Sequence, residues 1–319
     1  MRVELALIGA GAVGLGVGSC ALAAGARVTF VTRPGSHQRR ALMQHGLLRT
    51  GLFGEVRIAP DRFEVVDRIE ALAGRRFDYL LVSTKTFDAP EVARQLALAW
   101  PRLSGARRLV LLYNGWGSAD SFAEQLPDQP IYSGRVITGF RRSQARAVEI
   151  TVHADAIRLG SLSGADPAPL VALCRLISKG GIPCEPSAAI GKDLWAKMLY
   201  NCALNPLGAL LGVPYGVLAE REPTRLIMAA VVSEIFLVMA ACGFESHWRS
   251  SAAYLETFYA ELLPPTARHE SSMLQDLRAG RRTEVDALCG AAAALGERAG
   301  VAAPVNAALC NLIHAIEAA

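Results

Sequence analysis

Three polar residues recur at helical spacing in the second half of the chain. Lys197, Asn201 and Asn205 occupy positions i, i+4 and i+8 of a segment that is otherwise mostly apolar. Successive members of such a series drift by only about 40° around a helix, so the three side chains share one stripe. A polar stripe on an apolar helix is typical of a helix that borders a polar cleft. Pro206 removes one backbone hydrogen bond and predicts a kink there.

A lysine and two amides on one stripe could act on a carbonyl group. A lysine whose pKa is lowered by partial burial can donate a proton to a carbonyl that is being reduced. Its charge also stabilises a developing alkoxide, and amides can orient a ligand without adding charge. Taken alone, Lys197 would be interpreted as a solvated surface lysine, so the prediction of a proton donor depends on the whole stripe.

A second polar segment, from Ser271 to Asp286, offers a carboxylate. Thr283-x-x-Asp286 resembles a capping box, which predicts that Thr283 begins a helix and that Glu284 lies in its first turn. There Glu284 could simply interact favourably with the helix dipole. Alternatively, it lies at the cleft, where it pairs with Lys197 or accepts a hydrogen bond from a substrate hydroxyl.

The N-terminal segment has the order of features that a dinucleotide site requires. A short apolar run, Leu5 to Ile8, predicts a buried strand, and a small-residue helix follows through Ala24. Between them lies a glycine turn, which allows a tight bend, close approach of a pyrophosphate and close packing of helix on strand. The helix N-terminus would face the phosphates. The residues of this predicted cofactor turn are Gly9, Ala10, Gly11, Ala12, Val13 and Gly14.

The same N-terminal run has a competing interpretation as a signal peptide or membrane anchor. Leu5 to Ala26 carries no charge, but Glu4 falls in what would be the basic region, and five glycines lie between Gly9 and Gly18. Both features argue against secretion. No other segment is expected to be long and apolar enough to span a bilayer.

Further strands place polar residues at their carboxyl ends. A second strand, Arg27 to Thr32, is followed by Arg33, where an NAD site would place an acid, so a 2′-phosphate and NADPH are favoured. Arg33 could also be a solvated loop residue. Lys85 follows a buried strand, Phe77 to Ser83, and is predicted to contact the cofactor. Asn114 follows the strand Arg108 to Tyr113, as a ligand to nicotinamide ribose or substrate, or as part of an ordinary Asn-Gly turn.

The remaining pattern predicts an α/β Rossmann-type N-terminal domain with extra antiparallel strands, followed by an all-α C-terminal domain. Residues 34–76 read as short strands and turns. The segments 131–138, 147–153 and 156–162 alternate and are expected to complete the sheet as antiparallel strands. A helix near 169–179 and a last strand near 180–186 follow. We place the domains at 1–186, which binds NADP, and 187–319, which is helical and binds substrate.

Net charge and cysteine content exclude some classes of function. The net charge is +4 and the basic residues are scattered, which argues against a nucleic-acid surface and suits a small anionic substrate. The seven cysteines are odd in number, without a C-x-x-C or a His/Cys cluster of zinc spacing, so no metal site is predicted. Free cysteines fit a reducing cytoplasm. Small-residue helices at 287–294 and 302–318 could pack within the domain or across a homodimer.

These features together resemble the ketopantoate reductase (2-dehydropantoate 2-reductase) family over the whole length. The resemblance rests mainly on the block Lys197-x-x-x-Asn201-x-x-x-Asn205-Pro and on Ser272-Met-Leu-Gln-Asp276 with Arg282-Thr-Glu284; the glycine turn, Arg33, Thr84-Lys85 and Asn114-Gly-Trp-Gly also match. It implies NADPH-dependent reduction of a 2-oxo acid, 2-dehydropantoate, to pantoate in the route to pantothenate.

The resemblance also implies a role for each site residue. Lys197 would be the general acid, and Glu284 would bind the substrate hydroxyl and tune Lys197. Arg33 and Lys85 would contact the 2′-phosphate end of the cofactor. The residues implied to hold substrate and nicotinamide ribose are Asn114, Asn201, Asn205 and Ser272. Two alternatives stay open: reduction of another branched or aromatic 2-oxo acid, and a redox sensor that binds NADP(H) without turnover.

Overall fold

The computed structural model describes residues 2–318 and divides into two compact units. The first unit comprises residues 1–113 and 118–190, and the second comprises residues 114–117 and 191–319. The sequence placed the division between 186 and 187. The short segment 114–117 joins the second unit because its backbone and its tryptophan are bound there, as described below.

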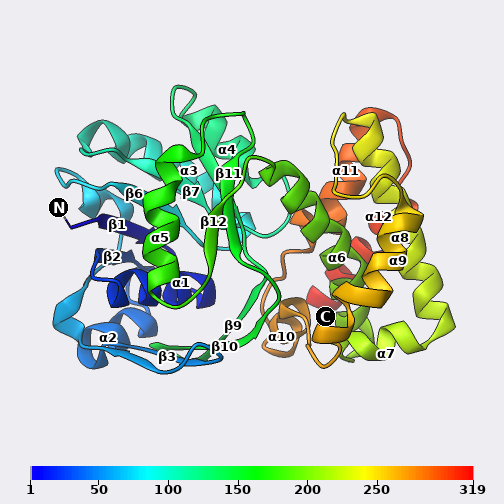
Figure 1. Ribbon diagram of the computed structural model, residues 1–319, viewed down its shortest axis with the longest axis horizontal. Coiled ribbons are helices and arrows are strands. Elements are labelled where there is room, and N and C mark those ends of the chain that lie inside the picture. The colour runs from blue at the N-terminus through cyan, green and yellow to red at the C-terminus, as the bar shows by residue number, and fades with distance from the viewer. Residues whose placement is uncertain (1, 319) are drawn as a thin grey trace. The chain divides into compact units, whose positions relative to one another are not determined.

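The first unit is built on an eight-stranded sheet in the order β12-β11-β8-β7-β6-β1-β2-β5 (Figure 1). Its strands are β1 (Glu4–Ile8), β2 (Arg27–Val31), β5 (Glu64–Val66), β6 (Tyr79–Val82), β7 (Arg108–Leu111), β8 (Ile131–Arg135), β11 (Ile157–Ser161) and β12 (Cys184–Pro186). The neighbouring strands β8, β7, β6, β1, β2 and β5 all run parallel to one another. Strand β11 is antiparallel to β8 and parallel to β12. The predicted parallel sheet is therefore confirmed.

Helices cover both faces of this sheet. Strand β1 shows this, because its alternate side chains are buried in two different cores, one on each face. Leu5 and Leu7 belong to the core shared with α1 (Ala12–Ala23) and α5 (Val171–Lys179). Ala6 and Ile8 belong to the core on the other face, with α3 (Ala89–Ala99) and α4 (Ser118–Gln125). A strand that is buried on both faces reads as a continuous apolar run, which is how β1 could be predicted from the sequence.

The strands after β8 differ from the prediction. Of the three predicted antiparallel segments, two join the large sheet, as β8 and β11. Strands β9 (Thr138–Gln144) and β10 (Ala147–His153) form a hairpin in a second sheet of order β4-β3-β10-β9. In that sheet β10 runs parallel to β3 (Leu47–Gly51), and β4 (Val56–Ile58) is its edge. The expectation that all of these strands are antiparallel additions to one sheet was therefore wrong. Alternation predicts a strand, but it does not tell which distant strand is its partner.

The second sheet explains the composition of α1. A Cβ at Gly16 would lie 2.2 Å from the ring of Phe140 on β9, and one at Gly18 would lie 2.6 Å from the ring of Phe30 on β2. Helix α1 is thus packed between two layers and is apolar on every side. Its glycines permit this close packing. The apolar composition that also suggested a signal peptide is therefore explained by burial of the helix on all sides.

Residues 34–76 contain a helix that the sequence analysis missed. Helix α2 (His37–His45) is polar and has a single buried side chain, Leu42, so it carries almost no hydrophobic periodicity. The available signal was its N-cap: the hydroxyl of Ser36 accepts a hydrogen bond from the Arg39 amide at 3.2 Å.

The second unit is helical, as predicted. Its helices are α6 (Ile190–Leu211), α7 (Tyr215–Glu220), α8 (Glu222–Ala241), α9 (Ser251–Thr257), α10 (Ser272–Arg278), α11 (Cys289–Ala299) and α12 (Pro304–Glu317). Helix α6 continues through Pro206. The core that these helices share includes Trp195, Tyr254 and Phe258, which are almost completely buried.

One expectation about membrane segments needs correction. Within residues 2–318, α8 has the length and composition of a membrane span, with a mean hydropathy of 1.9, whereas α1 is apolar but shorter. In this unit one face of α8 is packed into the core, through Met228, Val232 and Ile235 among others. A buried helix in a globular core passes the same composition test.

Candidate functional site

A chain of hydrogen bonds connects the predicted catalytic residues of the second unit. The Lys197 ammonium donates to the side-chain oxygen of Asn114 at 2.5 Å, and the Asn114 amide nitrogen donates to the Glu284 carboxylate at 3.3 Å. All three side chains are partly buried. The two contacts fix which way the Asn114 amide points, because its oxygen faces a cation and its nitrogen faces an anion.

Asn114 is held in place by its neighbours in sequence. The Trp116 amide donates to the Ala287 carbonyl at 2.9 Å, and the Trp116 ring packs against Trp195 and Phe244, with centroid distances of 4.6 and 4.9 Å. Gly115 has φ +76°, and a Cβ there would lie 2.0 Å from the Ala287 oxygen. The Asn-Gly-Trp segment is therefore bound to the turn that follows Glu284, and glycine is required at its second position.

A small polar cavity adjoins this chain of hydrogen bonds. Four predicted substrate ligands and Glu284 line it, together with three residues that the sequence analysis did not assign. The lining residues are Asn114, Asn201, Asn205, Ser272, Met273, Asp276, Glu284 and Leu288. Lys197 is not among the lining residues, but it reaches the cavity wall through Asn114.

Helices α6 and α10 position the amides and hydroxyls of the cavity. Asn205 is buried, and its side-chain oxygen accepts a hydrogen bond from the Tyr215 hydroxyl at 2.7 Å. Burial raises the pKa of Tyr215, so the hydroxyl stays a donor. The fully buried Ser271 caps α10 by accepting from the Leu274 amide at 3.0 Å, which places Ser272 at the start of that helix.

Asp276 is a buried carboxylate that the sequence analysis quoted without giving it a role. It lies one turn after Ser272 on α10, and it accepts a hydrogen bond from Arg281 at 2.9 Å. The i, i+4 spacing of Ser272 and Asp276 was the signal available in the sequence. The cavity therefore has two carboxylates, Asp276 and Glu284, together with three amides.

The predicted helix start at Thr283 was wrong. Residues Val285–Ala287 form one turn of 3₁₀-helix, and α11 begins only at Cys289. Both halves of the expected capping box are bound elsewhere: the Thr283 amide donates to Glu317 at 2.6 Å, and the Asp286 carboxylate contacts Arg282 and His314. Glu284 thus precedes a 3₁₀ turn instead of lying in the first turn of an α-helix.

The predicted cofactor residues lie in the first unit. The turn between β1 and α1 contains Gly9 to Gly14; Gly9 has φ +94°, and a Cβ at Gly14 would lie 2.1 Å from the Gly9 oxygen. A Cβ at Gly11 would meet only the Ser83 oxygen, at 3.7 Å. The protein itself therefore requires glycine at positions 9 and 14, whereas nothing within the described residues crowds position 11.

Arg33 and Lys85 follow two strands that flank β1 in the sheet. The exposed Arg33 forms an ion pair with Asp88 at 2.8 Å, and Asp88 belongs to a 3₁₀ turn, Thr86–Asp88, that directly follows Lys85. Because β2, β1 and β6 are parallel neighbours, both residues lie at the carboxyl edge of the sheet with the glycine turn. Asp88 was not singled out in the sequence.

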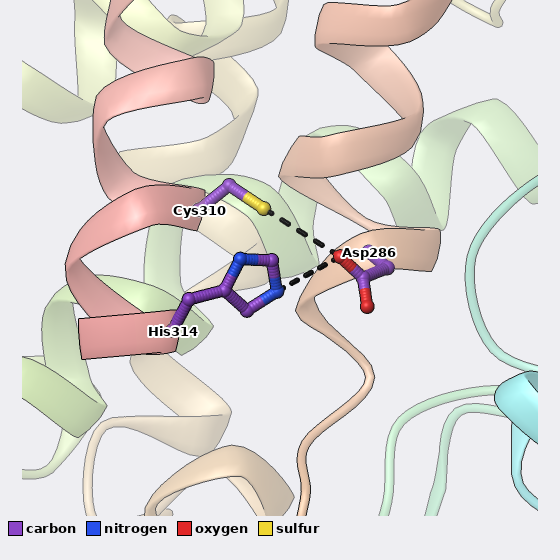
Figure 2. Close-up of side chains that lie close together, drawn as sticks. All are labelled: Asp286, Cys310 and His314. Atoms are coloured by element: carbon purple, nitrogen blue, oxygen red, sulfur yellow. Dashed lines mark hydrogen bonds and ion pairs between the residues drawn. The ribbon is translucent and has the colours of Figure 1, made fainter. Parts of the chain in front are cut away.

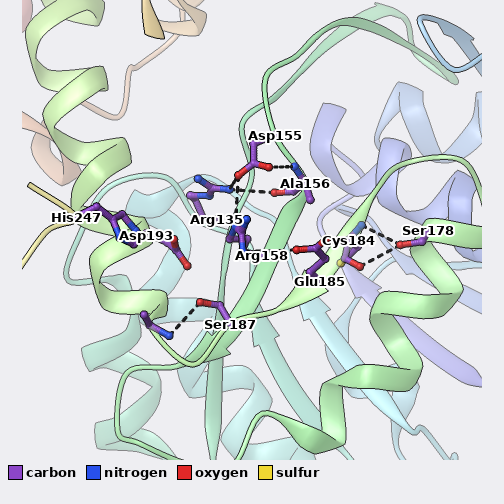
Figure 3. A network of polar contacts seen from close by, with 11 residues as sticks. Arg135, Asp155, Ala156, Arg158, Ser178, Cys184, Glu185, Ser187, Asp193 and His247 are labelled. Atoms are coloured by element: carbon purple, nitrogen blue, oxygen red, sulfur yellow. Dashed lines mark hydrogen bonds and ion pairs between the residues drawn. The ribbon is translucent and has the colours of Figure 1, made fainter. Parts of the chain in front are cut away.

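A further polar network lies beside strands β8, β11 and β12 in the first unit (Figure 3). Asp155 accepts hydrogen bonds from Arg135 at 2.5 Å and from Arg158 at 3.4 Å, and Arg158 also contacts Glu185 at 3.6 Å. Burial alone would raise the pKa of Asp155, but the arginine contacts and the Ala156 amide outweigh it and lower the pKa. This network links three strands, so we interpret it as structural.

Two family models match the chain. The model of "Ketopantoate reductase PanE/ApbA" matches residues 5–164, and the model of its C-terminal part matches residues 189–317. The chain belongs to the ketopantoate reductase family. The family is one of oxidoreductases, and the resemblance inferred from the sequence is confirmed.

Individual relatives cover nearly the whole length of this chain. The 2-dehydropantoate 2-reductase of Aquifex aeolicus (strain VF5) is 32% identical over 99% of this chain and 98% of that protein. A crystal structure of a PanE/ApbA family ketopantoate reductase from Ralstonia eutropha JMP134 is 27% identical, covers 99% of this chain and 98% of its own, and has a TM-score of 0.83. D-mandelate dehydrogenase with NADH and anilino(oxo)acetate has the same fold, with a TM-score of 0.84, 23% identity and coverage of 99% and 98%.

Proposed function

We propose that this member of the ketopantoate reductase family reduces 2-dehydropantoate to pantoate with NADPH. The observation that carries the proposal is the Lys197–Asn114–Glu284 chain of hydrogen bonds beside a small polar cavity. A proton donor, a fixed amide and a carboxylate are the groups that reduction of a hydroxylated 2-oxo acid requires. The Aquifex aeolicus relative, which bears the name of this activity, supports the choice of substrate.

The glycine turn fits a dinucleotide. Gly9 and Gly14 are explained by the packing of the protein, but Gly11 is not, because a side chain there would meet only an ordinary contact at 3.7 Å. An uncrowded glycine at the N-cap of α1 is what close approach of a pyrophosphate would require. NADPH, when bound, supplies the hydride for carbon 2 of the substrate. Ala10, Ala12 and Val13 would contribute backbone to the same turn.

Residues of the second unit would then handle the proton and the orientation of the substrate. Lys197 donates a proton to the carbonyl oxygen as it becomes an alkoxide, and its charge stabilises that oxygen. Asn114 keeps Lys197 and Glu284 at fixed positions on either side of its amide. Glu284 accepts a hydrogen bond from the substrate hydroxyl, and the amides and hydroxyl of Asn201, Asn205 and Ser272 orient the remaining polar groups.

A panel of 2-oxo acids with NADPH oxidation as the readout tests the proposal. We expect the highest kcat/KM with 2-dehydropantoate, because Glu284 can pair with its hydroxyl group. A higher kcat/KM with an aromatic or branched 2-oxo acid lacking that hydroxyl would favour the second candidate, a reductase of another 2-oxo acid. NADPH binding without oxidation of any member would indicate the third candidate, a redox sensor.

Cofactor preference is a separate part of the proposal. Arg33 is exposed and forms an ion pair with Asp88, so it can exchange that carboxylate for a 2′-phosphate. We expect Arg33→Ala to raise the Kd for NADPH at least ~10-fold, about 1.4 kcal/mol, and to change the Kd for NADH much less. Arg27→Ala is a matched control, because Arg27 is an exposed, ion-paired arginine at the other end of the same strand. Equal losses for both cofactors would contradict the role of Arg33.

A cytoplasmic location, a small 2-oxo acid as the partner, and a homodimer complete the proposed description. The location is supported by the cysteines, since all seven are free thiols and six of them are buried. No role at a membrane or on nucleic acid is proposed.

A further inference from the structure

Three potential metal ligands converge at a place where the sequence analysis predicted none. Cys310 and His314 lie one turn apart on α12, and Asp286 lies in the 3₁₀ turn before α11. Figure 2 shows the three side chains pointing toward one another from these two elements. Their sulfur, nitrogen and oxygen ligand atoms all lie within 4.8 Å of one another.

The spacing of the two ligands on α12 is one that zinc sites use. The pair Cys310-x-x-x-His314 was missed in the sequence, because it is neither a C-x-x-C motif nor part of a larger His/Cys cluster. Residues at i and i+4 lie on one face of a helix and can hold one ion together. The third ligand could not have been found from the sequence, since Asp286 is brought close only by the fold.

The distances are close to those of a tetrahedral ion. With metal–ligand bonds of about 2.1 Å to oxygen and nitrogen and about 2.3 Å to sulfur, tetrahedral geometry predicts about 3.4 Å between oxygen and nitrogen and about 3.6 Å between oxygen and sulfur. The Asp286 oxygen lies 2.9 Å from His314 Nε2 and 3.9 Å from Cys310 Sγ. Both distances are thus within about 0.5 Å of the tetrahedral values, and the third pair, the His314 nitrogen and the Cys310 sulfur, lies within 4.8 Å.

The surrounding residues leave room for an ion beside these three ligands and orient the Asp286 carboxylate. A Cβ at Gly290 on α11 would lie 3.2 Å from Cys310 Sγ and 3.7 Å from the same Asp286 oxygen, so glycine leaves that side uncovered. The other Asp286 oxygen accepts a hydrogen bond from Arg282 at 3.0 Å, which orients the carboxylate from outside. Asp286 does not serve as a cap of α11, because no side chain caps that helix.

The ligand set selects among metals. A thiolate, an imidazole and a carboxylate suit zinc, whereas magnesium and calcium prefer oxygen ligands only. Burial, together with the nearby carboxylates of Asp286 and Glu317, raises the pKa of the Cys310 thiol to about 12, so without a cation the thiol keeps its proton. Binding of zinc would replace that proton, which leaves to solvent.

We propose that Asp286, Cys310 and His314 form a zinc site that, with water as the fourth ligand, ties the turn carrying Glu284 to α12. Asp286 is two residues after Glu284, and the Thr283 amide is already bound to Glu317 on the same helix. A bound ion would add a second, stronger connection between the turn and α12. The site is distinct from the proposed reductase cavity, since none of its three ligands lines that cavity.

Titration of the full chain with cobalt(II), a spectroscopic substitute for zinc, tests the site. We expect one cobalt per chain, an absorption band from thiolate ligation, and loss of that band when zinc is added. Cys310→Ser should abolish the band, and His314→Asn should weaken binding at least ~10-fold. Cys242→Ser, which changes the cysteine that is not fully buried, should leave both unchanged.

The zinc proposal would be overturned by a wild-type protein without a thiolate band, or by a Cys310→Ser protein that keeps the band and the stoichiometry. Circular dichroism of each metal-free variant shows whether it is folded. The exposed His314 offers a second, milder variant should Cys310→Ser not fold. Magnesium should neither displace cobalt nor protect the protein against heat. These measurements do not depend on reductase activity, so they stand apart from the test of the proposed function.

Discussion

At the scale of single residues, the role of Lys197 is set by its partner. Its ammonium donates to Asn114 at 2.5 Å, and Asn114 in turn donates to Glu284. The sequence predicted Lys197, Asn201 and Asn205 as one stripe, since helical spacing is regular. It could not predict the pairing of Lys197 with Asn114, because 83 positions separate the two residues. Nor could it show that Trp116 holds Asn114 in place, since the rings that contact Trp116 belong to residues distant in sequence.

Replacement of Lys197 tests its assignment as the proton donor. We expect Lys197→Ala to lower kcat at least ~10²-fold, because loss of a general acid typically costs that much, while the Kd for NADPH changes little. Steady-state kinetics on the preferred 2-oxo acid measure the first effect, and cofactor titration measures the second. Lys192→Ala is the matched control, because Lys192 lies on the same helix and forms an exposed ion pair with Glu245. An unchanged kcat in Lys197→Ala would remove this residue from the mechanism.

At the scale of elements, the sequence predicted those that bury a regular face and missed those that do not. Strands β1 and β2 have clear apolar patterns, and the segments predicted for them, Leu5 to Ile8 and Arg27 to Thr32, lie close to their observed bounds. Helix α2 buries only Leu42, so its sequence is nearly indistinguishable from a loop. The start of α11 was misplaced because the Thr283 amide finds a carboxylate on α12 instead of one within its own helix. At the start of α11, a partner distant in sequence therefore decides the local structure.

The junction of β1 and α1 permits a prediction that separates folding from binding. A Cβ at Gly14 would lie 2.1 Å from the Gly9 oxygen, so Gly14→Ala should lower the free energy of unfolding by about 1–3 kcal/mol. A Cβ at Gly11 is unhindered, so Gly11→Ala should change that free energy by less than about 1 kcal/mol while weakening NADPH binding. Denaturant unfolding and cofactor titration on both variants measure the two quantities. Unweakened binding in Gly11→Ala would argue against a pyrophosphate at this turn.

At the scale of the whole molecule, the architecture of the second unit was predicted from the sequence more completely than that of the first. The helical unit was predicted as a class from its periodicity, and the parallel sheet from its buried strands. The second sheet was not, because β10 pairs with β3 across about a hundred residues, as in the register of Ala147 with Leu48. Such pairings depend on the packing of α1 between the two sheets, and no local pattern records that packing. The ligands of the proposed zinc site were missed for a similar reason.

A histidine beside the candidate site is expected to make the protein less stable in acid. Partial burial lowers the pKa of His269 below its usual value of 6.5, and the charge of Glu270 offsets this only in part. The His269 ring packs edge-on against Tyr215 at a centroid distance of 5.4 Å, and the Tyr215 hydroxyl holds Asn205. Between the folded pKa and about pH 6.5 the unfolded chain therefore binds more protons than the folded chain.

This difference in proton binding predicts the sign of the pH dependence. As the pH falls below about 6.5, His269 should make the free energy of unfolding fall progressively, until the pH reaches the lowered pKa of the folded protein. We expect His269→Gln to be less stable near pH 8, where the wild-type ring is neutral and packed, but to lose less stability on acidification to pH 5. Urea denaturation at several pH values measures both trends. His247→Gln is the matched control, since His247 is more exposed and is paired with Asp193 at 2.9 Å. Equal losses of stability in the wild type and in His269→Gln would assign the acid sensitivity of this unit to other groups.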